Sequence, residues 1–313
     1  MIGTVYKSTG NLYSVHTDSN EIFKCNIKGK FRSFGIKSTN PIAVGDTVRF
    51  EILDEKESIG IIYEIEKRKN YIIRKSVNLS KLSHIIASNI DCCFLFVTPN
   101  NPTTSSVFID RVLVATRSFG IETIILFNKI DLYTKSEIEH VDYLKNIYTK
   151  IGYKCLNISV LKEINIDKVV DIMKNRISIF TGHSGVGKSS LINLLDPRLN
   201  LKIGRVSEQN EQGQHTTTFA EMFNLNFGAK IIDSPGIKGF GLIDIEKNEI
   251  RNYFSEFESH KDDCKFNDCL HENEPKCAIK QAVNNGIISE SRYKSYLSML
   301  VNDNKNYRTD FWN

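Results

Sequence analysis

Short runs of alternating apolar and polar residues make up most of the first 70 positions. In one of them Val48, Phe50 and Ile52 alternate with polar neighbours, which is the period of a strand with one buried face. The same pattern predicts five strands, at 2–6, 12–16, 21–25, 47–53 and 60–65. Short strands joined by Gly- and Asn-containing turns favour a small β-barrel such as the OB-fold, although an SH3-like barrel fits the same strand count.

Beyond residue 90 the pattern changes to continuous apolar runs that alternate with longer amphipathic segments. The apolar runs predict strands at 90–97, 121–127, 153–158 and 177–181, and helical spacing predicts helices at 106–119 and 137–151. This alternation is typical of a parallel sheet covered by helices. After Gly241 the chain becomes polar, and two further helices are expected at 276–285 and 289–300.

The pattern divides the chain into three domains. We expect an OB-like barrel at 1–70, an α/β domain at 71–245 and a mostly helical domain at 246–313, with the first boundary at the charged, solvated run 67–70. A length of 313 residues suits this division, because single domains usually hold about 100 to 200 residues. No apolar run approaches the roughly 18 residues that span a bilayer, and the N-terminus lacks a signal-peptide pattern. A cytoplasmic protein without a membrane partner is expected.

The net charge is mild, at +4, but it is unevenly placed. Residues 22–45 hold no acidic side chain, and basic and aromatic residues are interleaved there. A face of this kind is typical of nucleic-acid binding. The RNA-binding residues expected on it are Lys28, Lys30, Arg32, Phe34 and Lys37.

A glycine-rich loop follows the predicted strand 177–181 and precedes an apolar helix start at Leu191. This context predicts a phosphate-binding P-loop, because glycines let backbone N–H groups point inward and the helix N-terminus favours an anion. Lys188 should reach the β- and γ-phosphates as a catalytic cation, and Ser189 should bind Mg²⁺. A chance glycine-rich turn is the alternative. The nucleotide-binding residues expected here are Gly182, His183, Ser184, Gly185, Val186, Gly187, Lys188, Ser189 and Ser190.

The sequence Asn-Lys-x-Asp ends the predicted strand 121–127 with Asn128, Lys129 and Asp131. Its Asp carboxylate can accept both the ring N1–H and the exocyclic amine of guanine, a pattern that adenine does not offer. GTP is therefore the expected nucleotide, and a polar turn after a strand is the alternative. Ser159 and Val160 follow the strand 153–158, and a backbone N–H there can contact guanine O6. Alanine is usual at the position of Val160, so a plain strand end also fits.

Asp233 follows a short apolar strand and begins the turn Asp-Ser-Pro-Gly. Its carboxylate would emerge beside the P-loop, where an acid holds Mg²⁺, and Gly236 can give its N–H to the γ-phosphate. On its own, Asp-x-Pro-Gly is also a common turn.

Three threonines lie between the P-loop and Asp233, in the polar stretch 213–218. Thr217, with Thr218 as second choice, is expected to close on Mg²⁺ and the γ-phosphate when GTP is bound. The threonines would equally start a strand at 219–225. Ile237 follows the Asp-Ser-Pro-Gly turn, so the glutamine that commonly positions the attacking water is missing. His215 is the nearest catalytic replacement, and a loop histidine without a role is the alternative.

The guanine motif lies upstream of the P-loop, the reverse of the order in ordinary GTPases. The same sheet forms when the original termini are joined and new ones are opened elsewhere, because termini in α/β domains often lie close together on the surface. The order therefore predicts a circularly permuted GTPase. It also places the loop at Asp233 directly before the C-terminal domain, so that a nucleotide-dependent shift there can move a whole domain.

Three of the seven cysteines crowd together with one histidine near the C-terminus, and the other four lie in apolar runs. Three thiols and one imidazole are a ligand set for tetrahedral Zn²⁺, and the absence of a carboxylate or open position suits one structural ion. Free surface thiols are the alternative, because the spacing departs from paired Cys-x2-Cys. The expected zinc ligands are Cys264, Cys269, His271 and Cys277.

Together these motifs resemble the RsgA family of small ribosomal subunit biogenesis GTPases. The resemblance implies a late-acting factor that binds the immature small subunit and its rRNA, hydrolyses GTP slowly until the ribosome stimulates it, and then leaves. It also implies that the switch-loop histidine, here His215, helps hydrolysis. Gln214 stands where the family commonly has arginine. The matching segments are 128–131, 182–189, 215–218, 233–236 and 264–277.

Two other functions fit parts of the sequence. One is a permuted GTPase that acts on another RNA-protein particle such as the large subunit, although such proteins lack the barrel and the cysteine cluster. The other is an RNA-binding scaffold with weak GTPase activity, which the intact Lys188, Ser189 and Asp233 oppose. A monomer is expected in each case.

Overall fold

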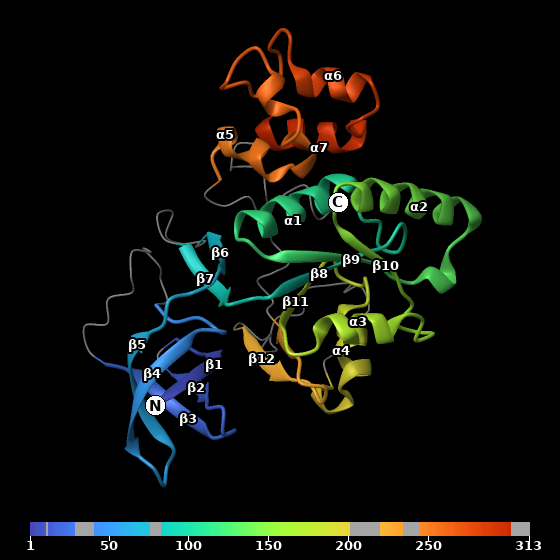
Figure 1. The fold of residues 1–313 in the computed structure, drawn as a ribbon. Helices are drawn as coiled ribbons and strands as arrows, with labels where there is room; N and C mark the ends of the chain where they lie inside the picture. Colours follow the sequence, from blue (N-terminus) through green and yellow to red (C-terminus); the bar gives the residue numbers. More distant parts are fainter. Residues whose placement is uncertain (11, 29–40, 76–82, 201–219, 234–244, 302–313) are drawn as a thin grey trace, which may run out of the picture.

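The computed structural model describes residues 1–10, 12–28, 41–75, 83–200, 220–233 and 245–301. Figure 1 shows a β-barrel at the N-terminal end, a central sheet covered by helices, and a helical part stacked above that sheet. Within this described part, no helix is long and apolar enough to cross a membrane. Several residues singled out above lie outside it, namely Lys30, Arg32, Phe34, Lys37, Gln214, His215, Thr216, Thr217, Thr218 and Gly236.

The N-terminal domain is a closed five-stranded barrel, as the alternating pattern predicted. Its strands are β1 (Ile2–Ser8), β2 (Tyr13–His16), β3 (Ile22–Ile27), β4 (Thr47–Asp54) and β5 (Ile59–Ile65). β1 pairs with both β2 and β4, which closes the ring, and β3 pairs with β5 in parallel. Val5, Phe23 and Phe50 fill its interior together with other alternate residues of the strands. The ring closure and mixed pairing match an OB-like barrel.

A two-stranded hairpin that the sequence pattern did not predict joins the barrel to the central domain. It consists of β6 (Tyr71–Lys75) and β7 (Ser83–Ser88). The charged run before it is not simply solvated, because the Arg68 guanidinium makes an ion pair of 2.6 Å with the fully buried Asp46. Asp46 also accepts a hydrogen bond of 2.6 Å from the Ser88 hydroxyl, so one carboxylate holds the barrel against the hairpin.

The central sheet has the strand order β10-β9-β8-β11-β13-β12. All neighbouring pairs are parallel except β12 with β13. β11 leads into the glycine-rich loop and lies inside the sheet. β9, which ends at the guanine motif, lies two strands away from β11 and precedes it in the chain. The strands are β8 (Cys92–Val97), β9 (Glu122–Phe127), β10 (Lys154–Asn157), β11 (Ile177–Thr181), β12 (Glu221–Asn224) and β13 (Lys230–Asp233).

Helices cover both faces of this sheet (Figure 1). Along β8, Leu95 packs toward α1 and α2, whereas Phe94 packs toward α3 and α4. A strand buried on both faces explains the continuous apolar run. The helices are α1 (Ser106–Ser118), α2 (Lys135–Lys150), α3 (Ile166–Met173) and α4 (Lys188–Leu195), with single 3₁₀ turns at Ile130–Leu132 and Pro197–Leu199. α3 was not predicted, since it has only eight residues and no side-chain cap.

The C-terminal domain packs on α1. It contains the short helices α5 (Lys247–Ile250) and α6 (Ala278–Asn284), three 3₁₀ turns between residues 251 and 263, and the longer α7 (Glu290–Val301). Arg292 of α7 is 1% exposed and makes ion pairs of 2.6 Å with Asp110 of α1 and 2.7 Å with Glu256. The Tyr148 hydroxyl of α2 donates to the same Asp110 at 2.8 Å. A buried polar network therefore fastens this domain to α1 and α2 of the central domain.

Candidate functional site

The glycine-rich loop between β11 and α4 depends on its glycines. Gly182, Gly185 and Gly187 all have positive φ, at 135°, 82° and 105°, which disfavours other residues. A Cβ added to Gly187 would lie 2.3 Å from the side-chain nitrogen of Asn128, so the loop also needs glycine for its close approach to the guanine motif. The Lys188 ammonium donates to the carbonyl oxygens of Gly182 and His183, at 2.7 and 2.6 Å, which holds its positive charge against the loop.

Helix α1 supports the same loop from the side. The imidazole of His183 stacks on the ring of Phe108 in the first turn of α1, with 4.2 Å between ring centroids. Burial, together with the charge of Lys188, lowers the pKa of His183. The neutral form of the ring is therefore favoured, and it packs on Phe108 as an aromatic side chain.

Asn128 joins three segments that are far apart in the sequence. Its side-chain amide donates to the carbonyl oxygen of Val186 at 2.7 Å, and its side-chain oxygen accepts from the backbone N–H of Val160 at 3.2 Å. Asn128 is 2% exposed, and a buried amide is stable only when its polar atoms are bonded. A contact from the Val160 amide to guanine O6, which the sequence predicts, would have to share this N–H with Asn128.

The carboxylate of Asp131 is oriented by a neighbouring loop. It accepts a hydrogen bond of 2.5 Å from the Ser159 hydroxyl, and that hydroxyl accepts one of 3.0 Å from the backbone N–H of Lys162. Lys129 has a positive φ of 70°, and its ammonium donates to the carbonyl oxygen of Asn101 at 2.5 Å. Burial lowers the pKa of Lys129 and Asp131 opposes that effect. The three predicted nucleotide segments thus meet at the carboxyl ends of β9, β10 and β11.

The predicted magnesium ligands lie at the same edge of the sheet. Ser189 is in the first turn of α4, and Asp233 is the last residue of β13, which pairs in parallel with β11. The hydroxyl and the carboxylate thus follow neighbouring strands at the same edge of the sheet. Both supply the hard oxygen ligands that Mg²⁺ prefers. Of the other residues predicted to contact the γ-phosphate or the metal, Thr217 and Gly236 lie outside the described residues.

The four predicted zinc ligands form a compact buried cluster. Their ligand atoms all lie within 4.8 Å of one another. The Cys264 sulfur is 4.0 Å from that of Cys277, and the Nδ1 atom of His271 is 3.6 and 3.4 Å from these two sulfurs. Tetrahedral zinc with Zn–S bonds of about 2.3 Å requires S···S edges of roughly 3.8 Å. The cluster therefore has the size and donor chemistry of a zinc site.

Hydrogen bonds to a carboxylate hold the chain around the cluster. The Glu274 carboxylate accepts hydrogen bonds of 2.7, 2.8 and 3.1 Å from the backbone N–H groups of Leu270, Glu272 and Asn273. Burial, reinforced by the neighbouring thiols, raises the pKa of Cys269 to about 12, and burial with Arg251 lowers the pKa of His271 to about 4. Without a cation the Cys269 thiol stays protonated, whereas a bound dication favours the thiolates that it needs.

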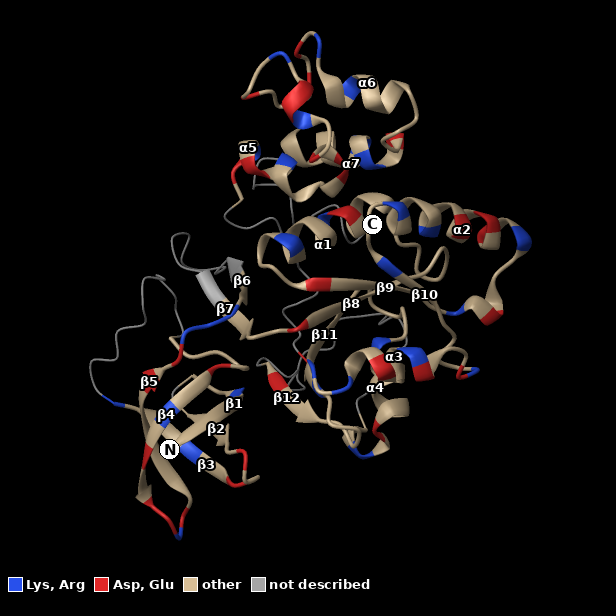
Figure 2. Cartoon of the chain, in the orientation of Figure 1, with Lys and Arg blue, Asp and Glu red and all other residues tan. Residues whose placement is uncertain are grey.

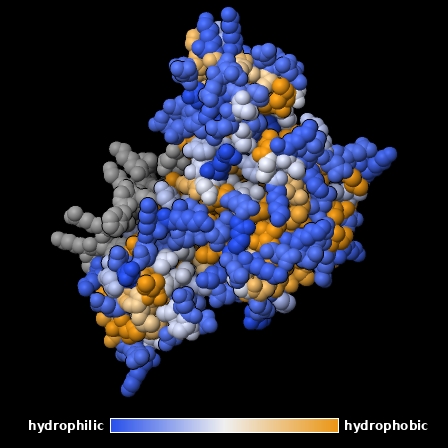
Figure 3. Space-filling model, viewed as in Figure 1, coloured by the Kyte–Doolittle hydropathy of each residue, from blue (hydrophilic) through white to orange (hydrophobic). Residues whose placement is uncertain are grey.

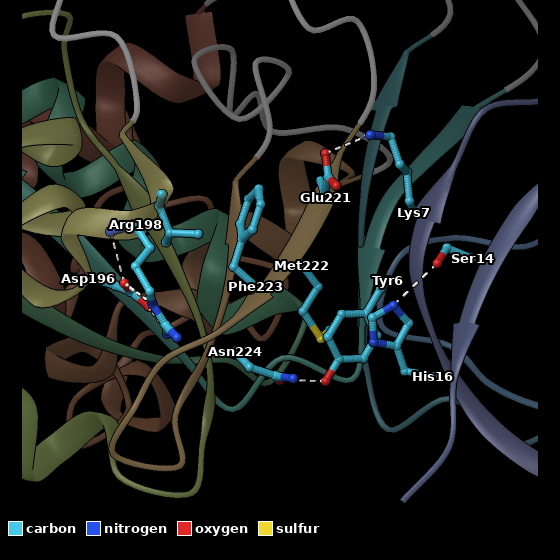
Figure 4. Close-up of a pocket in the computed structure, with 11 residues that line it drawn as sticks. Tyr6, Lys7, Ser14, His16, Asp196, Arg198, Glu221, Met222, Phe223 and Asn224 are labelled. Carbon is cyan, nitrogen blue, oxygen red and sulfur yellow. Dashed lines mark hydrogen bonds and ion pairs between the residues drawn. The ribbon is translucent and has the colours of Figure 1, made fainter. Parts of the chain in front are cut away.

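A cleft that the sequence did not indicate lies between the barrel and the central sheet. It has a volume of about 420 Å³ and is shown in Figure 4. Tyr6 of β1 stacks on His16 with 3.8 Å between ring centroids, and its hydroxyl donates to the Asn224 side chain of β12 at 2.6 Å. Lys7 makes an ion pair of 2.9 Å with Glu221, where β1 pairs with β12. These contacts attach the barrel to the strand that begins three residues after Thr218.

Two family profiles match the chain. The RsgA N-terminal domain matches residues 2–62, and the RsgA GTPase domain matches residues 65–243. Among similar proteins, the small ribosomal subunit biogenesis GTPase RsgA of Flavobacterium psychrophilum is 56% identical over 315 residues, covering 100% of this chain and 96% of the relative. The protein of the same name from Christiangramia forsetii is 54% identical over 311 residues, covering 99% of both chains.

Solved structures are similar over nearly the same length. YjeQ from Thermotoga maritima superposes with a TM-score of 0.79 at 34% identity, covering 96% of both chains. YloQ, described as a circularly permuted GTPase, superposes with a TM-score of 0.74 at 28% identity, covering 96% of this chain and 93% of that one. The similarity therefore includes the barrel, the reordered central sheet and the C-terminal helices.

Proposed function

The chain belongs to the RsgA family of GTPases and hydrolyses GTP, and from this membership we propose that it acts in late maturation of the small ribosomal subunit. In this proposal it binds the immature subunit and its rRNA in the GTP state, is stimulated by the ribosome, and leaves after hydrolysis. The observation that supports its GTP-binding part is the meeting of the P-loop, the guanine motif and the loop at Ser159 around one buried side chain, Asn128.

We propose the following nucleotide contacts. Lys188 and the backbone of residues 182–190 hold the phosphates, and Asp131 reads the guanine edge with Lys129 beside it. Ser189 and Asp233 hold Mg²⁺, which would neutralise phosphate charge when bound. Thr217 closes over the same ion, Gly236 donates to the γ-phosphate, and His215 positions the attacking water. The resemblance and the sequence order support these last three roles.

We propose one structural Zn²⁺ on Cys264, Cys269, His271 and Cys277. Their mutual distances and burial support it. The domains are taken as 1–70, 71–245 and 246–313, and the protein as a cytoplasmic monomer. The proposed rRNA-binding face contains Lys28, which is exposed directly after β3, together with the basic residues that follow it in the sequence.

We further propose that the nucleotide sets the orientation of the domains. β12, which is attached to the barrel at Lys7 and Tyr6, begins three residues after Thr218. Asp233 ends β13, and the C-terminal domain follows it in the chain. GTP bound at Thr217 and Asp233 would therefore bias both neighbouring domains toward an arrangement that fits the subunit.

The test measures GTP turnover by the full chain, with and without purified small subunits, and co-sedimentation with those subunits in the presence of GDP or a non-hydrolysable GTP analogue. We expect faster turnover with small subunits and tighter binding with the analogue. Large subunits serve as the comparison. Equal co-sedimentation in the two nucleotide states would contradict the switch, and stimulation by large subunits alone would contradict the assigned particle.

A further inference from the structure

One hairpin of the barrel has a charge opposite to that of the chain. Residues 51–66, which span the second half of β4, the turn and all of β5, contain six acidic residues and one lysine, whereas the whole chain has a net charge of +4. Arg49 pairs with two of the acids, Glu64 and Glu66, at 3.5 and 2.6 Å. The other four acids, in the second half of β4 and in the turn, are all exposed, namely Glu51, Asp54, Glu55 and Glu57. Figure 2 shows acidic residues on this hairpin.

The same hairpin presents apolar side chains to solvent. In β5 the buried Gly60 and Ile62 alternate with Ile59, Ile61 and Tyr63 on the outer face. Ile59 and Tyr63 are 36% and 39% exposed. The surface view shows hydrophobic residues gathered on the outside of the barrel (Figure 3).

A β-bulge adds the most exposed of these side chains. The register between β4 and β5 shifts between Ile52 and Asp54, so Leu53 is the extra residue, and it is 63% exposed. A bulge redirects a side chain away from the strand pairing, and bulges are common at sheet edges and barrel rims. The backbone N–H groups of Lys56 and Glu57 donate to the Asp54 carboxylate at 2.9 and 3.1 Å, so the turn beside Leu53 is well ordered.

We propose that the outer face of the β4–β5 hairpin, with Leu53, Ile59 and Tyr63 at its centre, docks onto a basic protein surface. The inference rests on the proposed function, and it identifies the partner of this face as a protein of the bound particle rather than RNA. RNA phosphates are repelled by the acids around Leu53, and stacking on RNA bases uses aromatic rings with basic neighbours. A basic protein surface complements the acids and buries the apolar centre.

The basic stretch 22–45 begins on β3, which pairs with β5 of the hairpin. Lys24 pairs with Ile59 across the β3–β5 ladder, and Lys28 follows at the end of β3. The other basic residues of the stretch 22–45 follow Lys28 in the sequence. In this proposal the barrel contacts RNA through the basic stretch and protein through the hairpin.

The first test is photo-crosslinking with a benzophenone amino acid at position 53 of the full chain, bound to purified small subunits with a non-hydrolysable GTP analogue. We expect an adduct that protease removes and ribonuclease leaves intact. An adduct that contains rRNA, or no adduct in a chain that still co-sediments, would overturn the inference. Absence of co-sedimentation by the wild-type chain would instead contradict the proposed function, and with it the partner assigned here.

The second test reverses the charge of two acidic residues in the turn of the hairpin. The double variant Glu55→Lys with Glu57→Lys should bind small subunits about tenfold more weakly if the partner is basic. Unchanged or tighter binding would overturn the inference, because added lysines strengthen contacts with RNA. Leu53→Ser should weaken binding by about fivefold with intrinsic GTP hydrolysis unchanged. The matched control changes an exposed apolar residue and acid on α2, Ile138→Ser with Glu139→Lys, and should leave binding unchanged.

Discussion

The side-chain amide of Asn128 donates a hydrogen bond of 2.7 Å to the carbonyl oxygen of Val186, which lies 58 residues further along the chain. This bond joins the guanine motif to the phosphate loop across the strand β8, so the two halves of the nucleotide site are held by one residue. The side-chain oxygen of Asn128 bonds the Val160 amide on its other side. The base-reading and phosphate-holding loops are therefore expected to lose order together.

Replacement of Asn128 by alanine should weaken binding of both GDP and GTP. The change leaves the Val186 carbonyl and the Val160 amide without their partner, and a lost buried partner costs about 1 to 3 kcal/mol. We expect nucleotide affinity to fall by roughly tenfold to a hundredfold, measured by titration with a fluorescent GDP analogue. The control Asn146→Ala removes an exposed amide on α2 and should have no effect. Affinity within twofold of wild type would contradict the role of Asn128.

Asp131→Asn should change the preferred base from guanine to xanthine. The amide replaces an acceptor with a donor at the edge where guanine offers N–H groups, and xanthine offers an oxygen there instead. Competition titrations with GTP, XTP and ATP measure the change. Equal affinity of the wild-type chain for ATP and GTP would show that this site does not read the base.

Arg292→Met should destabilise the protein by about 3 to 5 kcal/mol at neutral pH, because it leaves Asp110 and Glu256 buried without their cation. Urea unfolding of the variant and wild type measures the difference. Lys294→Met, an exposed change on the same helix, serves as the control and should unfold as wild type does. A loss no larger than that of the control would show that the network does not hold the C-terminal domain on α1.

The loss caused by Arg292→Met should also depend on pH in a defined direction. Burial raises the pKa of Asp110 above its usual value, and Arg292 opposes the shift. Without Arg292 the pKa rises further, so the folded variant binds a proton more tightly than its unfolded chain. Its stability relative to wild type should therefore improve as pH falls from 8 to 6. A difference that grows on acidification would contradict this assignment.

Cys269→Ser should lose the bound metal and unfold the C-terminal domain first. The wild-type chain purified without chelator is expected to hold one zinc, because binding at this cluster contributes directly to folding. Elemental analysis and circular dichroism before and after chelation give the measurement. Cys155→Ser, which alters a thiol outside the cluster, should keep the metal. Wild-type protein without zinc, or full retention in Cys269→Ser, would exclude the site.

Combined replacement of Lys28, Lys30 and Arg32 by alanine should weaken small-subunit binding and reduce its dependence on salt, since fewer counterions are released. Intrinsic GTP hydrolysis should be nearly unchanged. His215→Ala should do the opposite, with binding preserved and stimulated turnover lowered. Co-sedimentation at several salt concentrations, with turnover of both variants, tests the pair. A triple variant that keeps both the affinity and the salt dependence of wild type would exclude this stretch as the RNA contact.

Many of the strands and helices were predictable because each has its own period of apolar residues. The strand ending at Thr181 was predicted with the bounds that it has, and α1 and the barrel strands were predicted to within a few residues. The buried face of a strand is apolar whichever strands it pairs with. The alternation can therefore be recognised without knowing those partners. The motifs behave similarly, because the glycines of the P-loop and the spacing of the cysteines reflect backbone and ligand requirements within one segment.

Only the folded structure revealed the contacts between segments that are far apart in the sequence, because no local sequence pattern predicts them. Arg292 and Asp110 lie 182 residues apart, and a charged residue on a helix is ordinarily expected to be exposed. The stacking of His183 on Phe108 and the bond from Tyr6 to Asn224 are of the same kind. Periodicity reports which face of each element is buried, whereas the pairing of those faces depends on how all of them pack at once. The attachment of the barrel and the C-terminal domain to the GTPase core was therefore decided by tertiary packing.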